Sequence, residues 1–139
     1  MAEIPRLNGA IRALEQGKAA FSTFSALDTG ATQAANAARY DAVVFEMEHN
    51  PYDVRALRDC MQYMLDRRQI WSAGSLAPAV TPIARVPANG GEMNQFLAKQ
   101  VLDMGVYGVL WPHVSTVEEA RNAVAACRYP RPASAPRRW

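Results

Sequence analysis

The chain has 139 residues, half of them apolar and one fifth charged, which is typical of a soluble globular domain with its own core. A net charge of +2, carried by dispersed basic residues, gives no indication of a nucleic-acid partner. No apolar run reaches the roughly 20 residues that span a membrane, and the N-terminus lacks a signal-peptide pattern. Two distant cysteines without metal-ligand spacing, Cys60 and Cys127, favour reduced thiols and a cytoplasmic location.

Strand and helix patterns alternate in the first half of the chain. Asp28 and Asp53 are placed as N-caps, each before a run compatible with a helix. After Asp53, apolar residues recur on one helical face at Val54, Leu57, Met61, Met64 and Leu65. The sequence predicts a helix over 11–16, a strand over 19–26, a helix over 28–38, a strand over 41–45 and a helix after Asp53.

The second half begins with a long connection, 69–82, which contains glycine, serine and two prolines. Near the end, Thr116 and Glu119 have the spacing of a capping box. The predicted elements are a strand over 83–86, a turn over 89–91, a helix over 92–104 that ends at Gly105, a strand over 107–111 and a helix through 127.

This alternation predicts an α/β fold with a parallel sheet and crossover helices. About four βα units fit within residues 1–130, and residues 131–139 read as an irregular tail rich in proline and arginine. Four units can make a doubly wound domain. A (β/α)8 barrel needs eight units and typically about 250 residues.

The most informative stretch, Asp41-Ala-Val-Val-Phe-Glu-Met-Glu-His-Asn50, is an apolar strand that ends in two carboxylates and a histidine. Side chains alternate along a strand, so Glu46 and Glu48 share one side and Met47 takes the other. His49 follows directly. The carboxyl ends of parallel strands are where α/β proteins keep their ligands, which makes this a candidate site.

Other strand ends offer further polar groups: Ser25 and Asp28, then Arg85, then His113. A guanidinium and imidazoles that meet carboxylates at one rim suit an anionic substrate and proton transfer. Structural interpretations are open for each group. Arg85 can be an ion-pair partner of a glutamate, and His113 an ordinary loop histidine.

The segments YDAVVFEMEHNPYDVRALRD and PIARVPANGGEMNQFLAKQVLDMGVYGVLWPHVSTVEEARNAVAACRYP resemble the HpcH/HpaI aldolases, metal-dependent class II pyruvate aldolases related to the citrate lyase β subunit. The resemblance covers roughly residues 21–130. Its motifs are acid-x-Glu-His after the second strand, Arg-Val-Pro at the third, and Lys-Gln-x-Leu-Asp-x-Gly before the fourth.

The resemblance implies a (β/α)8 barrel, commonly a hexamer, that reversibly cleaves 4-hydroxy-2-oxo acids to pyruvate and an aldehyde. It also implies a divalent metal, Mg²⁺, Mn²⁺ or Co²⁺, that holds the pyruvyl group and stabilises its enolate.

For individual residues, the resemblance assigns His49 to acid–base work on the aldol hydroxyl through a metal-bound water. Arg85 would polarise the pyruvyl oxygen, and Asp103 would partner the histidine. Asp103 can instead pair with Lys99 four residues earlier on the helix. Glu46, where many members carry aspartate, and Glu48 join Arg85 in the expected substrate-binding set.

In the family the metal ligands come from later strands, so the chain resembles an N-terminal half, and we expect no metal ligands in it and no catalysis by it alone. Two alternative functions are open: a stand-alone α/β module that binds a partner without catalysis, and a citrate lyase-like enzyme that acts on acyl-CoA.

Overall fold

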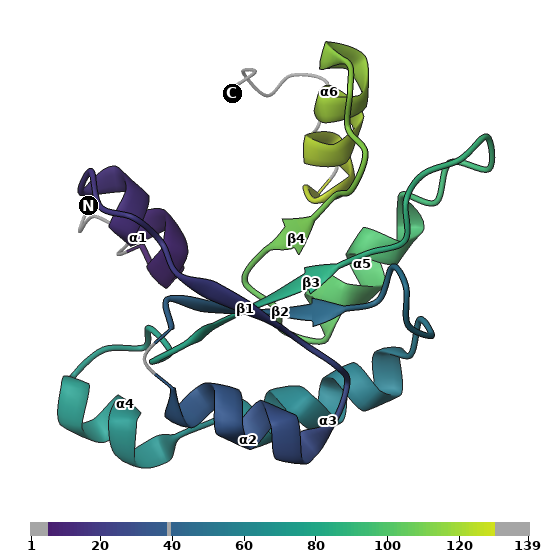
Figure 1. The fold of residues 1–139 in the computed structure, drawn as a ribbon. Coiled ribbons are helices and arrows are strands. Elements are labelled where there is room, and N and C mark those ends of the chain that lie inside the picture. Colours follow the sequence, from purple (N-terminus) through teal and green to yellow (C-terminus); the bar gives the residue numbers. More distant parts are fainter. Residues whose placement is uncertain (1–5, 39, 130–139) are drawn as a thin grey trace.

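The computed structural model describes residues 6–38 and 40–129. Within these residues the predicted helices and strands follow one another in the predicted order, and one further helix lies before the third strand (Figure 1). The strands are β1 (Ser22–Ser25), β2 (Ala42–Glu46), β3 (Thr81–Arg85) and β4 (Val109–Leu110). The helices are α1 (Gly9–Glu15), α2 (Thr29–Ala37), α3 (Val54–Met64), α4 (Arg67–Ala73), α5 (Phe96–Asp103) and α6 (Val117–Ala126).

The sheet is parallel and its strands lie in sequence order, β1-β2-β3-β4, which confirms the predicted α/β fold. Consecutive order distinguishes it from a doubly wound sheet, in which the strand order reverses at a switch point. It agrees with the first four units of a (β/α)8 barrel. The register places Glu46 beside Arg85, and Arg85 beside Leu110.

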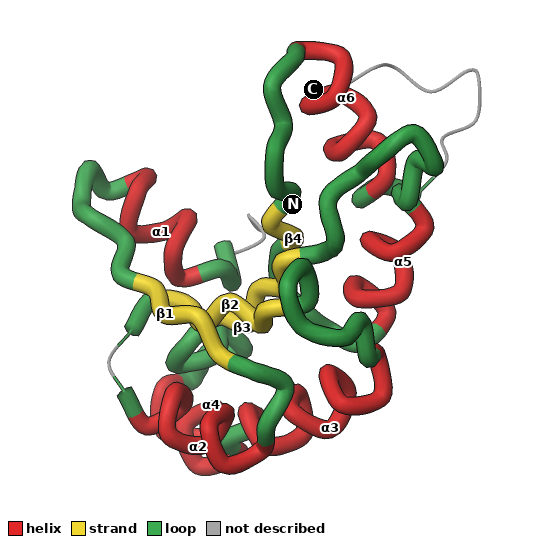
Figure 2. The backbone as a smooth tube through the Cα atoms, turned by 45° about the vertical axis from the view of Figure 1, so that its right-hand side comes forward, coloured by secondary structure: helices red, strands yellow, loops and turns green. Residues whose placement is uncertain are grey.

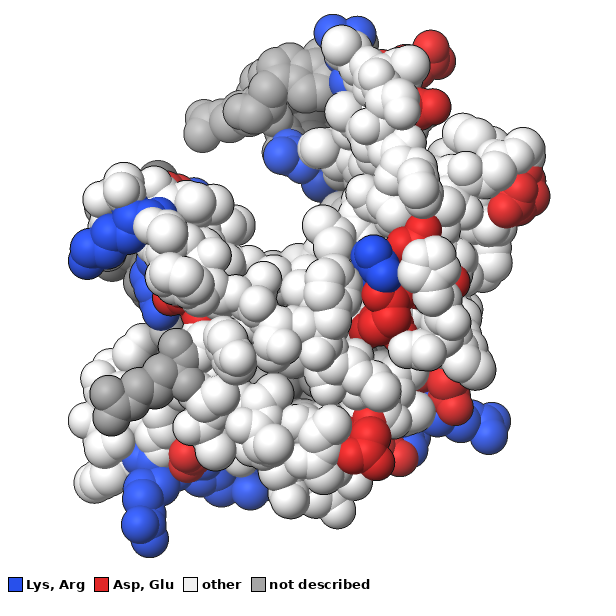
Figure 3. Space-filling view, viewed as in Figure 1, with Lys and Arg blue, Asp and Glu red and all other residues white. Residues whose placement is uncertain are grey.

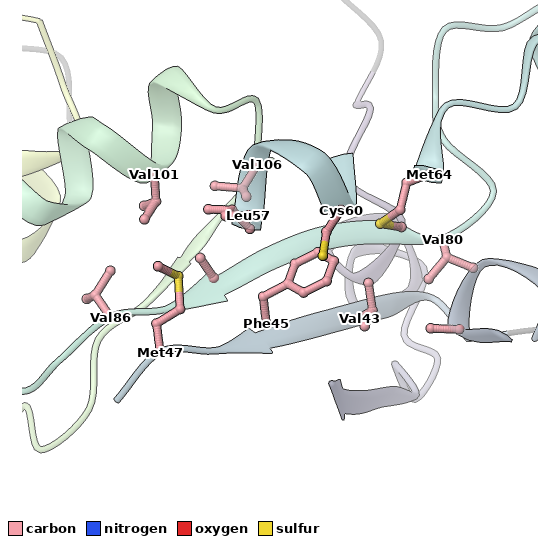
Figure 4. Close-up of a cluster of buried hydrophobic side chains, with 12 residues drawn as sticks. Val43, Phe45, Met47, Leu57, Cys60, Met64, Val80, Val86, Val101 and Val106 are labelled. Atoms are coloured by element: carbon pink, nitrogen blue, oxygen red, sulfur yellow. The ribbon is translucent and has the colours of Figure 1, made fainter. Parts of the chain in front are cut away.

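Helices α2, α3 and α5 lie along one side of the sheet, whereas α1 lies on the other side, as the two ribbon views agree (Figures 1 and 2). The core fills the space between the sheet and α3 and α5. Alternate residues of β2 and its extension enter this core, which also takes Leu57 and Cys60 of α3 and Val101 of α5 (Figure 4). The core residues contributed by β2, β3 and the residues that directly follow them are Val43, Phe45, Met47, Ala84 and Val86.

Helix α1 is tied to the amino ends of the strands. Asn8, its N-cap, accepts a hydrogen bond from Ile11 N, and its side-chain amide donates to the carbonyl of Tyr107 at 3.2 Å. The Gly9 N–H donates to the Thr81 hydroxyl at 2.7 Å, and both residues are buried. Helix α1 therefore covers the amino ends of the strands, at the opposite end of the sheet from the predicted site.

Two element predictions were wrong in the long connection and beyond it. The segment 69–82, which was predicted to be a connection, contains most of α4. This helix buries no residue, so its sequence shows no apolar periodicity. Its capping residues are Asp66 at the start and Gly74 (φ +58°) at the end. Helix α5 starts at Phe96 and not at residue 92, because Met93 adopts a left-handed backbone (φ +56°) that interrupts the helix.

Strand bounds also differ. β1 is shorter than predicted, and β3 begins at Thr81 and includes Pro82. Pro82 is tolerated because its carbonyl still accepts a hydrogen bond from Tyr107 N, and its missing N–H faces a neighbour whose strand has not yet begun. In α3 the buried face is formed by Leu57, Cys60 and Met64, whereas Leu65 is exposed at the C-cap. The predicted tail over 131–139 lies outside the described residues.

Replacing Gly9 by alanine tests how closely α1 packs on the sheet. A Cβ at this position would lie 3.0 Å from the Asp41 carbonyl oxygen and 3.1 Å from the Thr81 hydroxyl. Although alanine is the better helix former, we expect Gly9→Ala to lower the free energy of unfolding by about 1–3 kcal/mol, as overpacking does. Urea unfolding followed by circular dichroism measures the change. Gly91→Ala, where a Cβ meets nothing within 4 Å, is the matched control, and equal stability of the two variants would contradict the packing.

Candidate functional site at the carboxyl ends of the strands

The turn after β2 is organised by the Glu46 side chain. Its Oε1 accepts hydrogen bonds from the backbone N–H of Glu48 at 2.8 Å and of His49 at 3.2 Å. Met47, between them, is fully buried in the core, and its N–H donates to the Arg85 carbonyl at 3.0 Å. The predicted alternation is confirmed, because Met47 points into the core while both glutamates point to the other side, toward Arg85.

Arg85, at the end of β3, pairs with both carboxylates. Its Nη2 donates to Glu46 Oε2, and its Nε lies 3.2 Å from Glu48 Oε2. Phe24 of β1 lies beneath the guanidinium, with 4.7 Å between Cζ and the ring centroid. In the space-filling view one small basic group lies between larger acidic groups over this end of the sheet, amid largely neutral surface (Figure 3).

Two histidines flank Glu48. Nε2 of His49 lies 3.6 Å from Glu48 Oε2, and Nε2 of His113, in the loop after β4, lies 3.2 Å from Glu48 Oε1. Both imidazoles are largely exposed, whereas the Glu48 side chain is only 6% exposed. The structure thus gathers two carboxylates, a guanidinium and two imidazoles from the ends of β2, β3 and β4. We call these five residues the rim cluster: Glu46, Glu48, His49, Arg85 and His113.

The hydrogen bonds fix the charge states of the central pair. Burial raises the pKa of Glu46, but the hydrogen bonds from Arg85 and from the N–H groups of Glu48 and His49 outweigh it, and the pKa is lowered overall. The hydrogen bond to Glu46 raises the pKa of Arg85 above its ordinary value. Glu46 is therefore a carboxylate and Arg85 a cation at neutral pH, ready to bind an anion or to stabilise a developing negative charge.

The sequence predicted that the side chains of the rim cluster would meet at the strand ends, left open whether His113 is an ordinary loop histidine, and did not single out Phe24. Phe24 could have been found from the alternation of side chains along the strands, because it lies on the same face of β1 as Glu46 does of β2. Ser25 and Asp28 do not join the site. The Ser25 hydroxyl donates to the Ala26 carbonyl, and the Asp28 carboxylate caps α2 by accepting from Ala31 N.

Asp103, the expected partner of His49, lies elsewhere. It is exposed at the last residue of α5, which runs back toward the amino ends of the strands. There it lines a hollow of about 380 Å³ with Lys99 and the end of α6, and no Lys99–Asp103 ion pair is present among the described side chains. Asp103 therefore lies near the amino ends of the strands, whereas His49 lies at their carboxyl ends. For this reason Asp103 does not partner His49 within this chain.

The described residues do not by themselves form a metal site. Residues 6–38 and 40–129 contain no group of three or more His, Cys, Asp or Glu side chains that could hold a metal ion. The two carboxylates of the rim cluster, Glu46 and Glu48, are already paired with Arg85. Among the same residues, no helix has the length and apolar character needed to cross a membrane.

The chain is thus a parallel βα-repeat protein whose charged and imidazole side chains meet at the carboxyl ends of its strands. This is the position where (β/α)8 barrel proteins have their active sites. The model of the HpcH/HpaI aldolase/citrate lyase family matches residues 24–135. The chain belongs to this family.

Individual relatives agree with that assignment. The chain is 36% identical over 125 residues to a hydroxypyruvate/pyruvate aldolase of Paraburkholderia phytofirmans, covering 89% of this chain and 41% of that protein. It is 36% identical over 99 residues to a 5-keto-4-deoxy-D-glucarate aldolase of Escherichia fergusonii, covering 71% of this chain and 33% of the relative.

Among solved structures, the fold matches an HpcH/HpaI aldolase/citrate lyase family protein of Burkholderia cenocepacia J2315 with a TM-score of 0.64 and 25% identity, over 91% of this chain and 45% of that one. The chain thus spans less than half the length of the relatives that it matches.

The acid dependence of stability tests the Glu46 hydrogen bonds. Because folding lowers the pKa of Glu46 from its ordinary value of 4.5, its contribution to stability is present above that pH and disappears as pH falls through the lower folded value. We expect Glu46→Gln to be less stable than wild type at pH 7, with the difference shrinking as pH falls from 4.5 to 2.5. Urea unfolding across this range measures it, with the exposed Glu15→Gln as control. A pH-independent difference would contradict the hydrogen-bonded carboxylate.

Proposed function

We propose that the chain supplies the N-terminal part of a carbon–carbon lyase that reversibly cleaves 4-hydroxy-2-oxo acids to pyruvate and an aldehyde. The observation that carries the proposal is the placement of Arg85. Its guanidinium stands among acid–base groups at the carboxyl rim, clamped by Glu46 at one nitrogen, while its buried Nε has no hydrogen-bond acceptor. An arginine held for structure alone would be expected to satisfy this N–H with the carboxylate beside it.

The reaction assigns one task to each group. His49 accepts the proton of the C4 hydroxyl as the C3–C4 bond breaks, which releases the aldehyde and moves the bonding electrons onto the C2 keto oxygen. Arg85 stabilises the negative charge of the resulting enolate. Return of the hydroxyl proton to C3 then gives pyruvate. Glu46 and Glu48 hold the guanidinium and the imidazole where the substrate arrives.

Several properties of the whole enzyme belong to this proposal and not to the described residues. They are a divalent metal (Mg²⁺, Mn²⁺ or Co²⁺), a homo-oligomeric assembly such as a hexamer, and a cytoplasmic location. Since the rim cluster alone does not fit a metal, the ligands would come from residues outside the described part of the chain. For the same reason we expect the 139 residues alone not to catalyse cleavage.

The names of the matched relatives favour an oxo-acid substrate over an acyl-CoA, because they are aldolases of pyruvate, hydroxypyruvate and a keto-deoxy sugar acid. A non-catalytic binding module has no separate observation in its favour. The acyl-CoA alternative is an outcome of the chimera test below.

Binding of pyruvate tests the role of Arg85 in the chain itself. We expect Arg85→Lys to weaken pyruvate binding by about tenfold, the loss of one hydrogen bond to a charged group, because lysine cannot offer the same N–H fork. Isothermal titration calorimetry of the 139-residue chain measures it. Arg58→Lys is the matched control, since Arg58 pairs only with its exposed neighbour Asp59 among the described side chains. Equal affinities of both variants would remove Arg85 from the site.

Cleavage activity tests the role of His49. A chimera would join residues 1–129 to the remaining part of the P. phytofirmans aldolase, and pyruvate release would be coupled to lactate dehydrogenase. We expect the chimera to cleave 4-hydroxy-2-oxo acids and not acyl-CoA thioesters, and His49→Gln to lower kcat by 100-fold or more, the usual scale of acid–base catalysis. A folded chimera that prefers acyl-CoA, or in which His49→Gln is fully active, would overturn the assignment.

A further inference from the structure

The carboxylate of Glu48 is shared among three potential donors from three different strand ends. Its Oε1 lies 3.2 Å from His113 Nε2, while its Oε2 lies 3.2 Å from Arg85 Nε and 3.6 Å from His49 Nε2. Glu48 is also the most buried side chain among those that form ion pairs in the described part of the chain. A small rotation of this carboxylate therefore determines which of the three groups it contacts most closely.

His113 faces Glu48 from a left-handed turn in the loop after β4. Its backbone φ is +57°, in a region that residues other than glycine adopt uncommonly and in which asparagine, aspartate and histidine are enriched. Its side chain is 76% exposed, so burial does not fix the position of the imidazole. The contact that the structure shows for the ring is the one between Nε2 and Glu48 Oε1, at 3.2 Å.

The other oxygen of Glu48 lies beside Arg85. Arg85 Nε is buried and within ion-pair distance of Glu48 Oε2, yet makes no hydrogen bond with it, so Oε2 does not lie along the N–H bond. Glu46 fixes the other end of the guanidinium and Phe24 lies beneath it. Buried N–H groups without an acceptor are rare, so this one is available to a turned Glu48, to a water molecule or to an arriving acceptor.

We propose that His113 is a positioning residue: by holding Oε1 of Glu48, it keeps this carboxylate from closing on Arg85 Nε and leaves that N–H for an oxygen of the bound 2-oxo acid. The positioning of Glu48 stands on the geometry of the chain alone. The identity of the arriving acceptor rests on the proposed function.

The first experiment needs no ligand. In ¹⁵N-labelled protein, the Arg85 Nε–H signal is assigned by its loss in Arg85→Lys. We expect His113→Asn, which keeps a residue tolerant of the left-handed backbone, to move this signal downfield and to slow its exchange with water by about tenfold as Glu48 turns to accept it. Ser115→Ala removes a neighbouring contact of the same loop, the hydrogen bond to the His113 carbonyl, and should leave the signal unchanged.

A double-mutant cycle then tests whether His113 acts through Glu48. We expect His113→Asn to weaken pyruvate binding by about tenfold in the wild-type background and by less than twofold in Glu48→Gln. An unchanged Arg85 signal in His113→Asn, or additive effects of the two substitutions, would overturn the proposal. If wild-type protein binds no pyruvate, the proposed substrate fails, and the ligand-free Arg85 signal alone still decides the role of His113.

Discussion

The pairing of Arg85 with Glu46 and Glu48 is the interaction on which the carboxyl rim depends. A guanidinium that is largely removed from water requires carboxylate partners, because an unpaired charge there is strongly destabilising. The parallel register supplies the first partner by placing Glu46 directly beside Arg85 on the neighbouring strand. A shift of β2 by one residue would replace that carboxylate by an apolar side chain and turn Glu46 toward the core.

The apolar core specifies the same register from the other side of the sheet. Val43, Phe45 and Met47 alternate with the residues that face Arg85, and all three are fully buried against the helical layer. Burying these side chains therefore also orients Glu46 and Glu48. The backbone of the turn adds a third constraint, since Glu46 accepts the N–H groups of Glu48 and His49 and so ties the histidine to the ion pair. Core packing, strand pairing and turn hydrogen bonds agree on one arrangement, which is the consistency expected of a sequence that specifies a single fold.

The features that could be predicted from the sequence are those set by local periodicity. Alternation along β2 predicted which side Glu46, Met47 and Glu48 would face, and the parallel topology predicted that Arg85 would end beside them. The capping box at Thr116 formed as expected. Helix α4 was not predicted because it has no buried face, and the contact of His113 with Glu48 could not be settled from the sequence because it depends on a left-handed loop backbone that no periodicity encodes.

Asp103 illustrates a different limit. The resemblance to the family located this residue in sequence, but the direction of α5 determines where it lies, and that direction carries Asp103 to the amino edge of the sheet. A motif identifies which residues matter, whereas the geometry of one chain shows only which of them that chain brings together. The hollow that Asp103 lines is thus a separate feature of the surface, distinct from the rim cluster.

The charge of the rim cluster sets what it can bind. Two carboxylates and one guanidinium leave one excess negative charge while both imidazoles are neutral. An oxo acid carries a negative charge of its own, so its attraction to Arg85 is opposed by the uncompensated carboxylate. A second positive charge at the rim would strengthen binding, and a cation held by residues outside the described part can provide it in the whole enzyme. Glu48 is the carboxylate that such a charge would offset, because it lies between Arg85 and both imidazoles.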